Sequence, residues 1–341
     1  MVKKVMHLLK TGDYSGAENV VFNIMSLDSS EHVYVSPEGR IATILKENDL
    51  EYIPIEKFTL LNISKAIKII KPDIIHAHDI TASIIAGVLK YRYPKIKIIS
   101  HIHNNDPRMR KLTKRLVLYS MVSKSFSEIL VVSQSVKNEF YWPHLIDRAI
   151  VLSNIVNESI IRRKSEQKTD FYDVLVVGRL TAQKDPMRAI SIIEDVKKEV
   201  TELRAGFIGE GELKELLERN IKDKKLSKNV DVLGFKDNPY AYMKRAKLLL
   251  LTSKYEGFGL VVLESLMLGT PVIATEVGGI PGILTNECGL LTNDSKAMSR
   301  RIISITQDKD MRERLSIAAM ERARTINNES KFKKILSEVY N

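Results

Sequence analysis

One stretch of the sequence decides the fold: Lys247-Leu-Leu-Leu-Leu-Thr-Ser-Lys-Tyr-Glu-Gly-Phe-Gly-Leu-Val-Val-Leu-Glu-Ser-Leu-Met-Leu-Gly-Thr-Pro-Val-Ile-Ala-Thr275. Its pattern predicts a buried strand at Leu248–Thr252, a glycine-bearing loop at 254–259, a helix at Leu260–Leu268 and then a second buried strand. A strand, a helix and a strand in this order form a βαβ unit, from which parallel α/β sheets are built.

Two glutamates of this stretch lie where a ligand is expected. Ligands of open parallel sheets bind outside the carboxyl ends of the strands, so Glu256 in the loop would meet one. Gly257 and Gly259 let the backbone approach a ligand closely, and the N–H groups that begin the helix favour an anion. Glu264 has a second interpretation as a solvated helix residue, but its helix is nearly all apolar, and a carboxylate there needs partners.

Length and composition are those of a globular protein with two domains. The 341 residues suffice for two cores. No run of about 18 apolar residues occurs, and the first residues are charged too early for a signal peptide. The single cysteine, Cys288, excludes an internal disulfide and fits a reducing compartment. These features predict a cytoplasmic protein.

The net charge of +11 is unevenly spread, and residues 108–124 contain no acidic side chain. If this stretch is helical, an apolar face is surrounded by basic residues: Arg110, Lys111, Lys114 and Arg115. Three interpretations remain, namely a core-facing helix with a solvated basic side, a contact with the anionic inner face of the plasma membrane, and a nucleic-acid patch. The last is weakest because no nucleic-acid motif or interleaved aromatic residue accompanies the charge, so we expect no nucleic-acid partner.

Strands and helices alternate in the first half, which predicts a doubly wound parallel sheet. Four histidines fall at carboxyl ends of its strands, namely His76, His78, His101 and His103. They allow a metal site, but no further ligand type recurs at zinc-like spacing. The sequence therefore predicts no metal.

The strand pattern restarts after a charged segment at 162–170, which is the candidate linker. A buried strand then delivers Gly178 and Arg179 to a loop, and Lys184 precedes the next helix. Both cations have an interpretation as solvated loop residues. Placed after a strand of the same sheet as the glutamate loop, they can instead bracket a diphosphate, because Arg offers a planar fork and Lys a point charge.

The pattern Tyr255-Glu-Gly-Phe-Gly-Leu-x-x-Leu-Glu264, followed by Gly269-Thr-Pro-Val-Ile-Ala274, resembles the Glu-x7-Glu signature of the retaining glycosyltransferases of family 4. The resemblance covers nearly the whole chain, and it is strongest from Val174 to Leu291. It implies an α/β protein of the GT-B fold, with two Rossmann-like, doubly wound parallel-sheet domains facing across a cleft. The implied parts are an acceptor-side domain at 1–165, a nucleotide-sugar-binding domain at 170–320, and a C-terminal helix at 321–341 that crosses back to the first domain.

The resemblance also implies a donor site. Its donor-binding residues would be Gly16, Arg179, Lys184, Phe235, Glu256, Gly257, Phe258, Gly259, Leu260 and Glu264, with His103, Glu256, Arg179 and Lys184 as catalytic residues. His103 matches the family histidine that approaches the donor sugar, with His101 as the alternative and His78 as an orienting residue. Ser15 stands where the family has the first glycine of a pair. Asp185 and Gly282 also depart from the pattern, which leaves the local helix geometry and the base open.

The implied reaction transfers a sugar, as a hexosyltransferase would, from a nucleotide diphosphate sugar to a hydroxyl acceptor with retained configuration. A UDP-sugar donor and a lipid-linked or surface polysaccharide precursor are the expected substrates. The only Asp-x-Asp pair, Asp308-Lys-Asp310, lies in a terminal helical segment. Fixed cations and helix N–H groups would therefore neutralise the departing phosphate, with no metal and no cofactor. The alternatives are a nucleotide-sugar epimerase on the same scaffold and a basic, non-catalytic protein that binds anionic surfaces.

Overall fold

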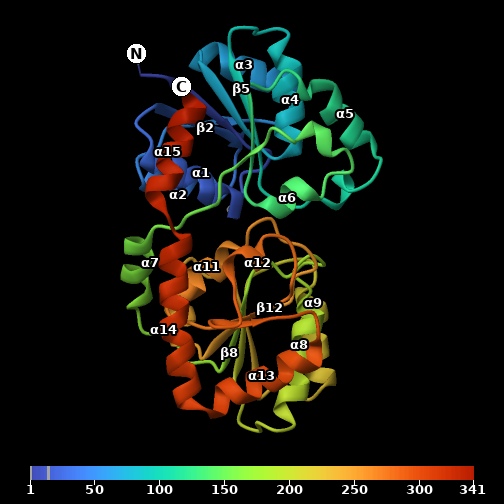
Figure 1. The fold of residues 1–341 in the computed structure, drawn as a ribbon, viewed down its shortest axis with the longest axis vertical. Helices are drawn as coiled ribbons and strands as arrows, with labels where there is room; N and C mark the ends of the chain where they lie inside the picture. The colour runs from blue at the N-terminus through green and yellow to red at the C-terminus, as the bar shows by residue number, and fades with distance from the viewer. Residues whose placement is uncertain (1, 14–15) are drawn as a thin grey trace. The chain divides into compact units, whose positions relative to one another are not determined.

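The computed structural model describes residues 2–13 and 16–341, which form two compact units (Figure 1). The first unit comprises the chain up to Ile155 together with Glu329–Asn341, and the second comprises Val156–Asn328. Ser15 lies outside the described residues.

In the described part of the first unit, parallel strands form a seven-stranded sheet in the order β3-β2-β1-β4-β5-β6-β7. The strands are β1 (Lys4–Leu8), β2 (Glu31–Pro37), β3 (Tyr52–Ile55), β4 (Ile74–His78), β5 (Lys97–Ile102), β6 (Glu128–Val131) and β7 (Ile150–Val151). The helices are α1 (Gly16–Leu27), α2 (Ile41–Glu47), α3 (Leu60–Ile70), α4 (Ile80–Lys90), α5 (Lys114–Ser123), α6 (Gln134–Asn138) and α15 (Glu329–Tyr340). Helices on both faces explain why β4 is buried along its whole length and β5 at every residue after Lys97.

The second unit repeats this architecture with a six-stranded parallel sheet among its described residues, in the order β10-β9-β8-β11-β12-β13. Its strands are β8 (Val174–Val177), β9 (Ala205–Ile208), β10 (Val230–Gly234), β11 (Leu248–Leu251), β12 (Val272–Ala274) and β13 (Gly289–Leu291). Its helices are α7 (Glu158–Ser165), α8 (Pro186–Lys197), α9 (Lys214–Asp223), α10 (Tyr240–Arg245), α11 (Leu260–Met267), α12 (Ile280–Ile283), α13 (Ser295–Gln307) and α14 (Lys309–Ile326). Two doubly wound parallel sheets confirm the predicted fold class.

The stretch that decided the fold forms the centre of the second sheet. Strand β11 pairs in parallel with β8 on one side and with β12 on the other. Helix α11 begins after Gly259, whose φ of 100° lies in the left-handed region, and a second left-handed glycine, Gly269 with φ of 74°, follows its end. The predicted βαβ unit is thus present, because glycine adopts these backbone conformations without strain.

The division of the chain differs from the predicted one. Residues 162–170 were interpreted as a linker, but the last four residues of helix α7 occupy 162–165, and α7 packs against α10 in the second unit. Lys244 forms an ion pair with Glu166, and the side-chain amide of Asn238 donates to the carbonyl of Lys164 at 2.9 Å. In the structure the second unit begins at Val156.

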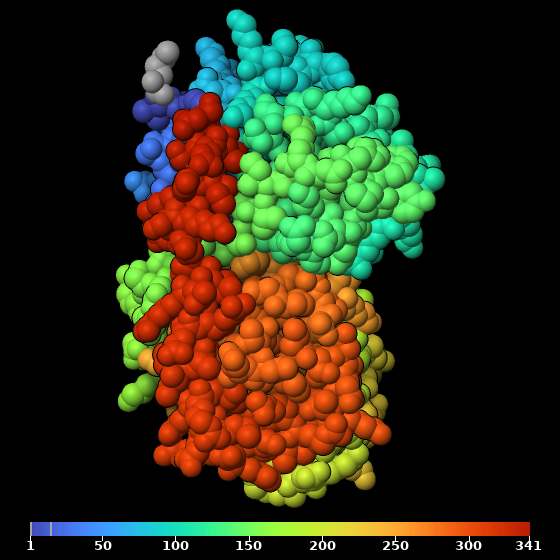
Figure 2. Space-filling model, viewed as in Figure 1, coloured from blue at the N-terminus to red at the C-terminus, as the bar shows by residue number. Residues whose placement is uncertain are grey.

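The end of the chain returns to the first unit (Figures 1 and 2). Helix α15 lies against the first sheet, where the Tyr340 hydroxyl hydrogen-bonds to Nδ1 of His76 at 2.8 Å. The ammonium of Lys97 on β5 donates to the carbonyl of Val339 at 2.8 Å. Two separate helices, α14 and α15, occupy the segment predicted as one C-terminal helix, and only the second belongs to the first unit.

Candidate functional site

The candidate site of the second unit lies at the carboxyl ends of β8 and β11. Because these two strands are neighbours in a parallel sheet, the loops that follow them meet at one edge. Lys184 comes from the loop after β8, and Glu256 comes from the loop after β11. The structure brings these two predicted site residues into direct contact.

Lys184 and Glu256 form an ion pair in which the ammonium donates to Oε1 of the carboxylate. The hydroxyl of Ser253 donates to the same oxygen at 2.7 Å. The side chains are only 19% and 8% exposed, so water screens the pair weakly. The cation predicted for the diphosphate and the carboxylate predicted for the sugar therefore neutralise each other.

Hydrogen bonds between the two loops hold this pair in place. The hydroxyl of Thr252 donates to the carbonyls of Lys184 and Asp185 at 3.1 and 2.9 Å. The side-chain amide of Gln183 donates to the carbonyl of Tyr255 at 3.0 Å, and the backbone N–H of Lys254 donates to the carbonyl of Gln183 at 2.8 Å. The position of the Lys184 ammonium is thus set by the backbone of the glutamate loop.

The backbone conformation and the side chain of Asp185 explain how this residue can replace the glycine of the family pattern. Its φ of 49° and ψ of 59° are left-handed, a conformation that favours glycine but that aspartate tolerates better than most residues. Its carboxylate accepts from the backbone N–H of Arg188 at 3.3 Å and so caps α8, whose first residue is Pro186. The helix after Lys184 therefore starts normally without the glycine.

A glycine turn supports the glutamate loop from the other side. Gly278 has φ of 56°, and a Cβ there would lie 1.7 Å from the carbonyl oxygen of Glu256. A Cβ on Gly279 would lie 2.5 Å from the carbonyl oxygen of Gly257. The sequence did not predict that this turn supports the backbone of Glu256.

Glu264 is buried inside α11, so its interpretation as a solvated helix residue is wrong. Its side chain accepts a hydrogen bond from the hydroxyl of Tyr240 at 3.3 Å. Burial raises the pKa of this carboxyl to about 7, although the Tyr240 hydrogen bond and the charge of Lys184 act in the opposite direction. Near neutral pH, the site therefore holds the Lys184–Glu256 ion pair and one partly protonated carboxyl, that of Glu264.

The other predicted residues of the second unit lie around this centre. Gly257, Phe258 and Gly259 are buried in the glutamate loop, and Leu260 is the first residue of α11. Arg179 is exposed, and its guanidinium donates to Oε1 of Gln183 at 3.3 Å. Phe235 follows β10 and is 43% exposed.

In the first unit, Gly16 is the first residue of α1, after the carboxyl end of β1. His103 follows β5, and its Nε2 lies 2.8 Å from Nδ1 of His78. Burial lowers the pKa of His103 to about 3, so the ring is neutral near neutral pH. The sequence placed both histidines at the same edge of the sheet, and the structure brings them into hydrogen-bonding contact.

Two further histidines, His7 and His32, join this cluster and were missed. Nε2 of His7 lies 2.9 Å from Nδ1 of His32, and its Nδ1 lies 3.0 Å from Nε2 of His78. His7 lies on β1, which pairs with the strand of His78, and His32 lies on β2, on the other side of β1. Without this strand order, nothing in the sequence connects the two histidines with His78.

Two trios of histidines are spaced closely enough to offer ligands to a metal ion, His7 with His76 and His78, and His78 with His101 and His103. Imidazole suits zinc and other transition metals. Most of these nitrogens already take part in hydrogen bonds between the rings, as at 3.2 Å between Nε2 of His76 and Nδ1 of His101. An ion at either trio would have to replace such hydrogen bonds.

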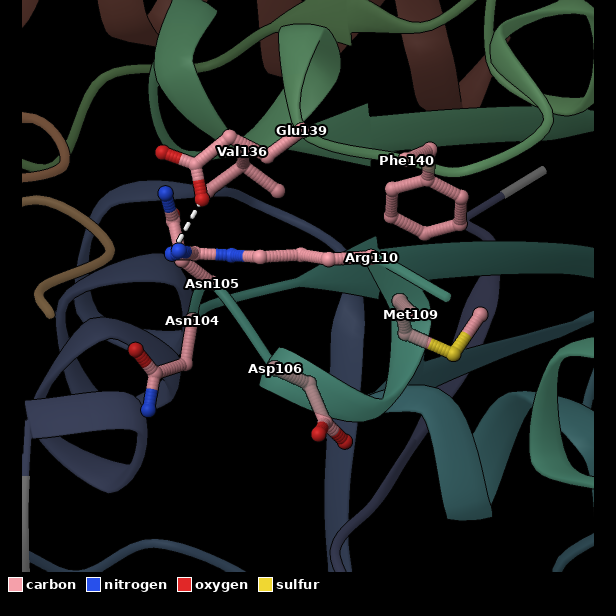
Figure 3. A pocket seen from close by; sticks show the side chains of 8 residues that line it. All are labelled: Asn104, Asn105, Asp106, Met109, Arg110, Val136, Glu139 and Phe140. Carbon is pink, nitrogen blue, oxygen red and sulfur yellow. Dashed lines mark ion pairs between the residues drawn. The ribbon is translucent and has the colours of Figure 1, made fainter. Parts of the chain in front are cut away.

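A pocket follows His103 along the chain (Figure 3). Its lining includes Asn104, Asn105, Asp106, Met109, Arg110, Val136, Glu139 and Phe140. Arg110 forms an ion pair with Glu139, as the dashed line shows. Arg115 likewise pairs with Asp106 at 3.2 Å. Two of the four predicted membrane-contact residues, Arg110 and Arg115, thus form ion pairs within the protein.

Helix α5 is core-facing on one side, since Leu116, Tyr119 and Val122 are buried. Other apolar side chains of the segment face solvent, because Leu112 and Met121 are 61% and 69% exposed. They share the surface with Lys111 and Lys114, which are also exposed. Residues 111–124 therefore present a mixed apolar and basic surface. No helix within residues 2–13 and 16–341 is long and apolar enough to cross a membrane.

Comparison with known proteins identifies the family. Residues 15–159 match the model of Glycosyltransferase Family 4, and residues 157–322 match that of Glycosyl transferases group 1. The chain belongs to glycosyltransferase family 4. It is therefore a glycosyltransferase that takes its sugar from a nucleotide sugar, and the alternative of a non-catalytic binding protein is wrong.

Relatives of this family 4 protein act on glycans. An N-acetyl-D-galactosaminyltransferase from Campylobacter jejuni, which acts on a GalNAc-containing diphospho-undecaprenol, is 26% identical over 99% of both chains. The poly(glycerol-phosphate) alpha-glucosyltransferase of Bacillus subtilis is 25% identical over 69% of this chain and 32% of its own length. Among solved structures, HepE from Anabaena, in complex with UDP and glucose, superposes with a TM-score of 0.88 at 17% identity over 99% of both chains. This likeness confirms the GT-B fold.

The buried Glu264 makes stability depend on pH. Its folded-state pKa of about 7 exceeds the ordinary value of 4.5, so its contribution is complete below about pH 4.5 and is lost as the pH rises through 7. A Glu264→Gln variant, which stays neutral, should gain thermal stability relative to the natural protein across this interval. Thermal unfolding without nucleotide at several pH values measures the difference.

The matched control is Glu287→Gln, which removes an exposed carboxylate of the same unit. Its difference from the natural protein should not change over the same interval. A Glu264→Gln effect that is equally independent of pH would show that this carboxyl ionises normally in the folded state.

Proposed function

We propose that the chain is a retaining glycosyltransferase that moves a hexose from a nucleotide diphosphate sugar, with UDP as the nucleotide, to a hydroxyl of a glycan or lipid-linked acceptor. The observation that carries this proposal is the Lys184–Glu256 ion pair at the carboxyl edge of the second sheet. A buried cation and carboxylate held together by two loops offer one group for a phosphate and one for a hydroxyl.

The chemical demand of the reaction is negative charge on the departing diphosphate. Lys184, the nearby Arg179 and the backbone N–H groups that begin α11 can stabilise that charge in a site that is largely shielded from water. The Asp308–Asp310 pair does not serve this site, since it lies at the junction of α13 and α14. We therefore assign charge stabilisation to fixed protein groups rather than to a metal ion.

The proposed roles of Glu256 and Glu264 follow from the change of partner that each carboxyl would undergo when the nucleotide sugar binds. When Lys184 turns to the diphosphate, Glu256 loses its cation and gains free lone pairs for hydroxyls of the transferred sugar. Glu264, which now accepts from Tyr240, would accept from ribose hydroxyls. Gly16 is assigned a place beside the phosphates, Phe235 a place beside the base, and His103 a place beside the transferred sugar.

The acceptor class is inferred from the relatives. A diphospho-undecaprenol acceptor in one, a poly(glycerol-phosphate) product in another, and O-antigen biosynthesis in an Escherichia coli relative that is 28% identical over 72% of both chains support a surface glycan precursor. The epimerase alternative requires turnover of the donor without any acceptor. Family membership favours transfer.

Replacing Glu256 separates binding from transfer. In Glu256→Gln, Lys184 loses its anionic partner, so UDP should bind more tightly, by roughly fivefold, as expected for about 1 kcal/mol of charge interaction. Transfer should fall by about 10²-fold because a group that acts on the sugar is altered. Lys184→Ala should instead weaken UDP binding and also lower the rate of transfer. Calorimetry with UDP and a transfer assay measure the two effects.

Glu215→Gln is the matched control for this pair of variants, because it changes an exposed carboxylate on α9, the helix that follows β9. It should leave UDP binding and transfer unchanged. Weaker UDP binding together with normal transfer in Glu256→Gln would contradict the proposed exchange of partners.

Charge stabilisation by Lys184 and Arg179 predicts metal-independent transfer. After extensive dialysis against EDTA, the initial rate should stay within about twofold of the untreated rate. The same rate should be obtained when Mg²⁺ or Mn²⁺ is added back. A loss of activity that only a divalent ion restores would overturn this part of the proposal.

We further propose that the surface of α5 contacts an anionic membrane, as a lipid-linked acceptor would require. The exposed Leu112, Leu118 and Met121 provide apolar side chains, and Lys111 and Lys114 provide charge. Arg110 and Arg115 are left out because both are ion-paired within the protein.

The double variant Lys111→Gln/Lys114→Gln should bind vesicles containing phosphatidylglycerol roughly 30-fold more weakly, from about 1 kcal/mol for each lysine near the surface. Neutralising two exposed lysines of the second unit, Lys222 and Lys225, is the control and should have little effect. Equal partitioning of all three proteins would leave α5 as ordinary surface. Vesicle sedimentation measures the partition.

A further inference from the structure

Six of the seven histidines lie together in the first unit, beneath α15 and on one face of the sheet. His7 and His76 are partners in the register of β1 and β4, as are His78 and His101 in that of β4 and β5. Side chains two residues apart in a strand share a face, which groups His76 with His78 and His101 with His103. An aliphatic layer would be the ordinary filling of such a core, so six imidazoles there require an explanation.

Four of these rings form one continuous chain of hydrogen bonds that starts at Asp28. Oδ2 of Asp28 lies 3.2 Å from Nε2 of His32, and Nδ1 of His32 lies 2.9 Å from Nε2 of His7. The next contacts are 3.0 Å from Nδ1 of His7 to Nε2 of His78, and 2.8 Å from Nδ1 of His78 to Nε2 of His103. Every link joins Nδ1 of one ring to Nε2 of the next.

The direction of this chain follows from its first member. Burial raises the pKa of Asp28, but hydrogen bonds from His32 and Ser30 outweigh burial and lower it to about 2, so the carboxylate is ionised and can only accept. With a single ring proton, His32 donates it to Asp28 through Nε2 and accepts at Nδ1. The same argument passes to His7, to His78 and finally to His103.

The last ring is left with one unused nitrogen. His103 donates through Nε2, so its Nδ1 carries a bare lone pair, and this atom is buried without a hydrogen-bond partner among the described residues. Burial lowers the pKa of His7 and His78 well below the ordinary value, and that of His103 to about 3, which keeps these rings neutral. A neutral ring has one donor and one acceptor, as the chain requires.

A second row of rings holds the first in position. Tyr340 from α15 hydrogen-bonds to Nδ1 of His76, and Nε2 of His76 contacts Nδ1 of His101. The rings of His76 and His78 stack with their centroids 4.2 Å apart, and the ring centroids of His101 and His103 are 4.0 Å apart. The ring planes of the chain are thus fixed by packing as well as by hydrogen bonds.

We propose that Asp28 is a positioning residue that acts through His32, His7 and His78 to fix His103 as the Nε2–H tautomer, so that Nδ1 accepts a hydrogen bond from a hydroxyl of the substrate. In taking a sugar hydroxyl as that partner, the inference rests on the proposed function. It assigns His103 to orienting a hydroxyl, and it excludes His103 as the donor of a proton through Nδ1.

The tautomers can be read directly from the ¹⁵N chemical shifts and two-bond couplings of histidine-labelled protein near neutral pH, without any substrate. His32, His7, His78 and His103 should all be Nε2–H tautomers, with exposed His144 as the internal reference. A protonated His32 would donate through both ring nitrogens, to Asp28 and to His7. Every hydrogen bond between the rings would then run in the opposite direction. An Nδ1–H tautomer at His103 in the natural protein would therefore overturn the proposal, as would bound zinc at one ion per chain.

Two variants test whether Asp28 sets the direction. Asp28→Leu removes the acceptor, so His103 should lose its single tautomer and show a mixture. Asp28→Asn should keep the Nε2–H tautomer, because the backbone N–H of Ser30 donates to the same Oδ2 at 2.9 Å and fixes an oxygen there. Glu31→Gln, an exposed carboxylate that pairs with Lys4, is the charge control and should change nothing. An unchanged single tautomer in a folded Asp28→Leu protein would overturn the role of Asp28.

Transfer kinetics distinguish this inference from the proposed function. Asp28→Leu should raise KM for the donor severalfold, and Asp28→Asn should restore it. Natural protein with the expected tautomers but no transfer would defeat the proposed function and leave the chain of hydrogen bonds intact. Normal transfer with the opposite tautomer at His103 would defeat the inference alone.

Discussion

The ion pair between Lys184 and Glu256 is the interaction on which the candidate site depends. Both side chains are largely shielded from water, and loss of either partner would leave an uncompensated charge. The loops around them are tied together through Thr252 and Gln183, and Gly278 lets a second backbone support Glu256. The charges of Lys184 and Glu256 therefore neutralise each other, and a diphosphate can take over the cation.

In the first unit, polar imidazole rings lie in the core, where they need hydrogen-bond partners. Its histidines hydrogen-bond to one another, and Asp28 and Tyr340 end the two rows. Two buried ring nitrogens, Nε2 of His101 and Nδ1 of His103, have no hydrogen-bond partner among the described residues, and only the second ends the chain that starts at Asp28. A buried acceptor without a partner is a natural place for a substrate hydroxyl.

The sequence predicted the fold well but predicted contacts poorly. The runs at Leu248–Leu251 and Val272–Ala274 are apolar throughout, which is typical of strands buried on both faces, so the central βαβ unit was recognisable. A motif indicates which loop carries Glu256 but not that Lys184 will meet it. The direction of the histidine chain needs the strand order, and charged residues at 162–170 are as typical of an exposed helix as of a linker.

The most direct test of the account is a crystal structure with an intact or non-hydrolysable UDP-sugar. We predict that Nζ of Lys184 leaves Oε1 of Glu256 and lies within hydrogen-bonding distance of a diphosphate oxygen, while Glu256 accepts from a hydroxyl of the sugar. A structure in which the Lys184–Glu256 pair remains closed and the diphosphate is bound elsewhere would contradict it.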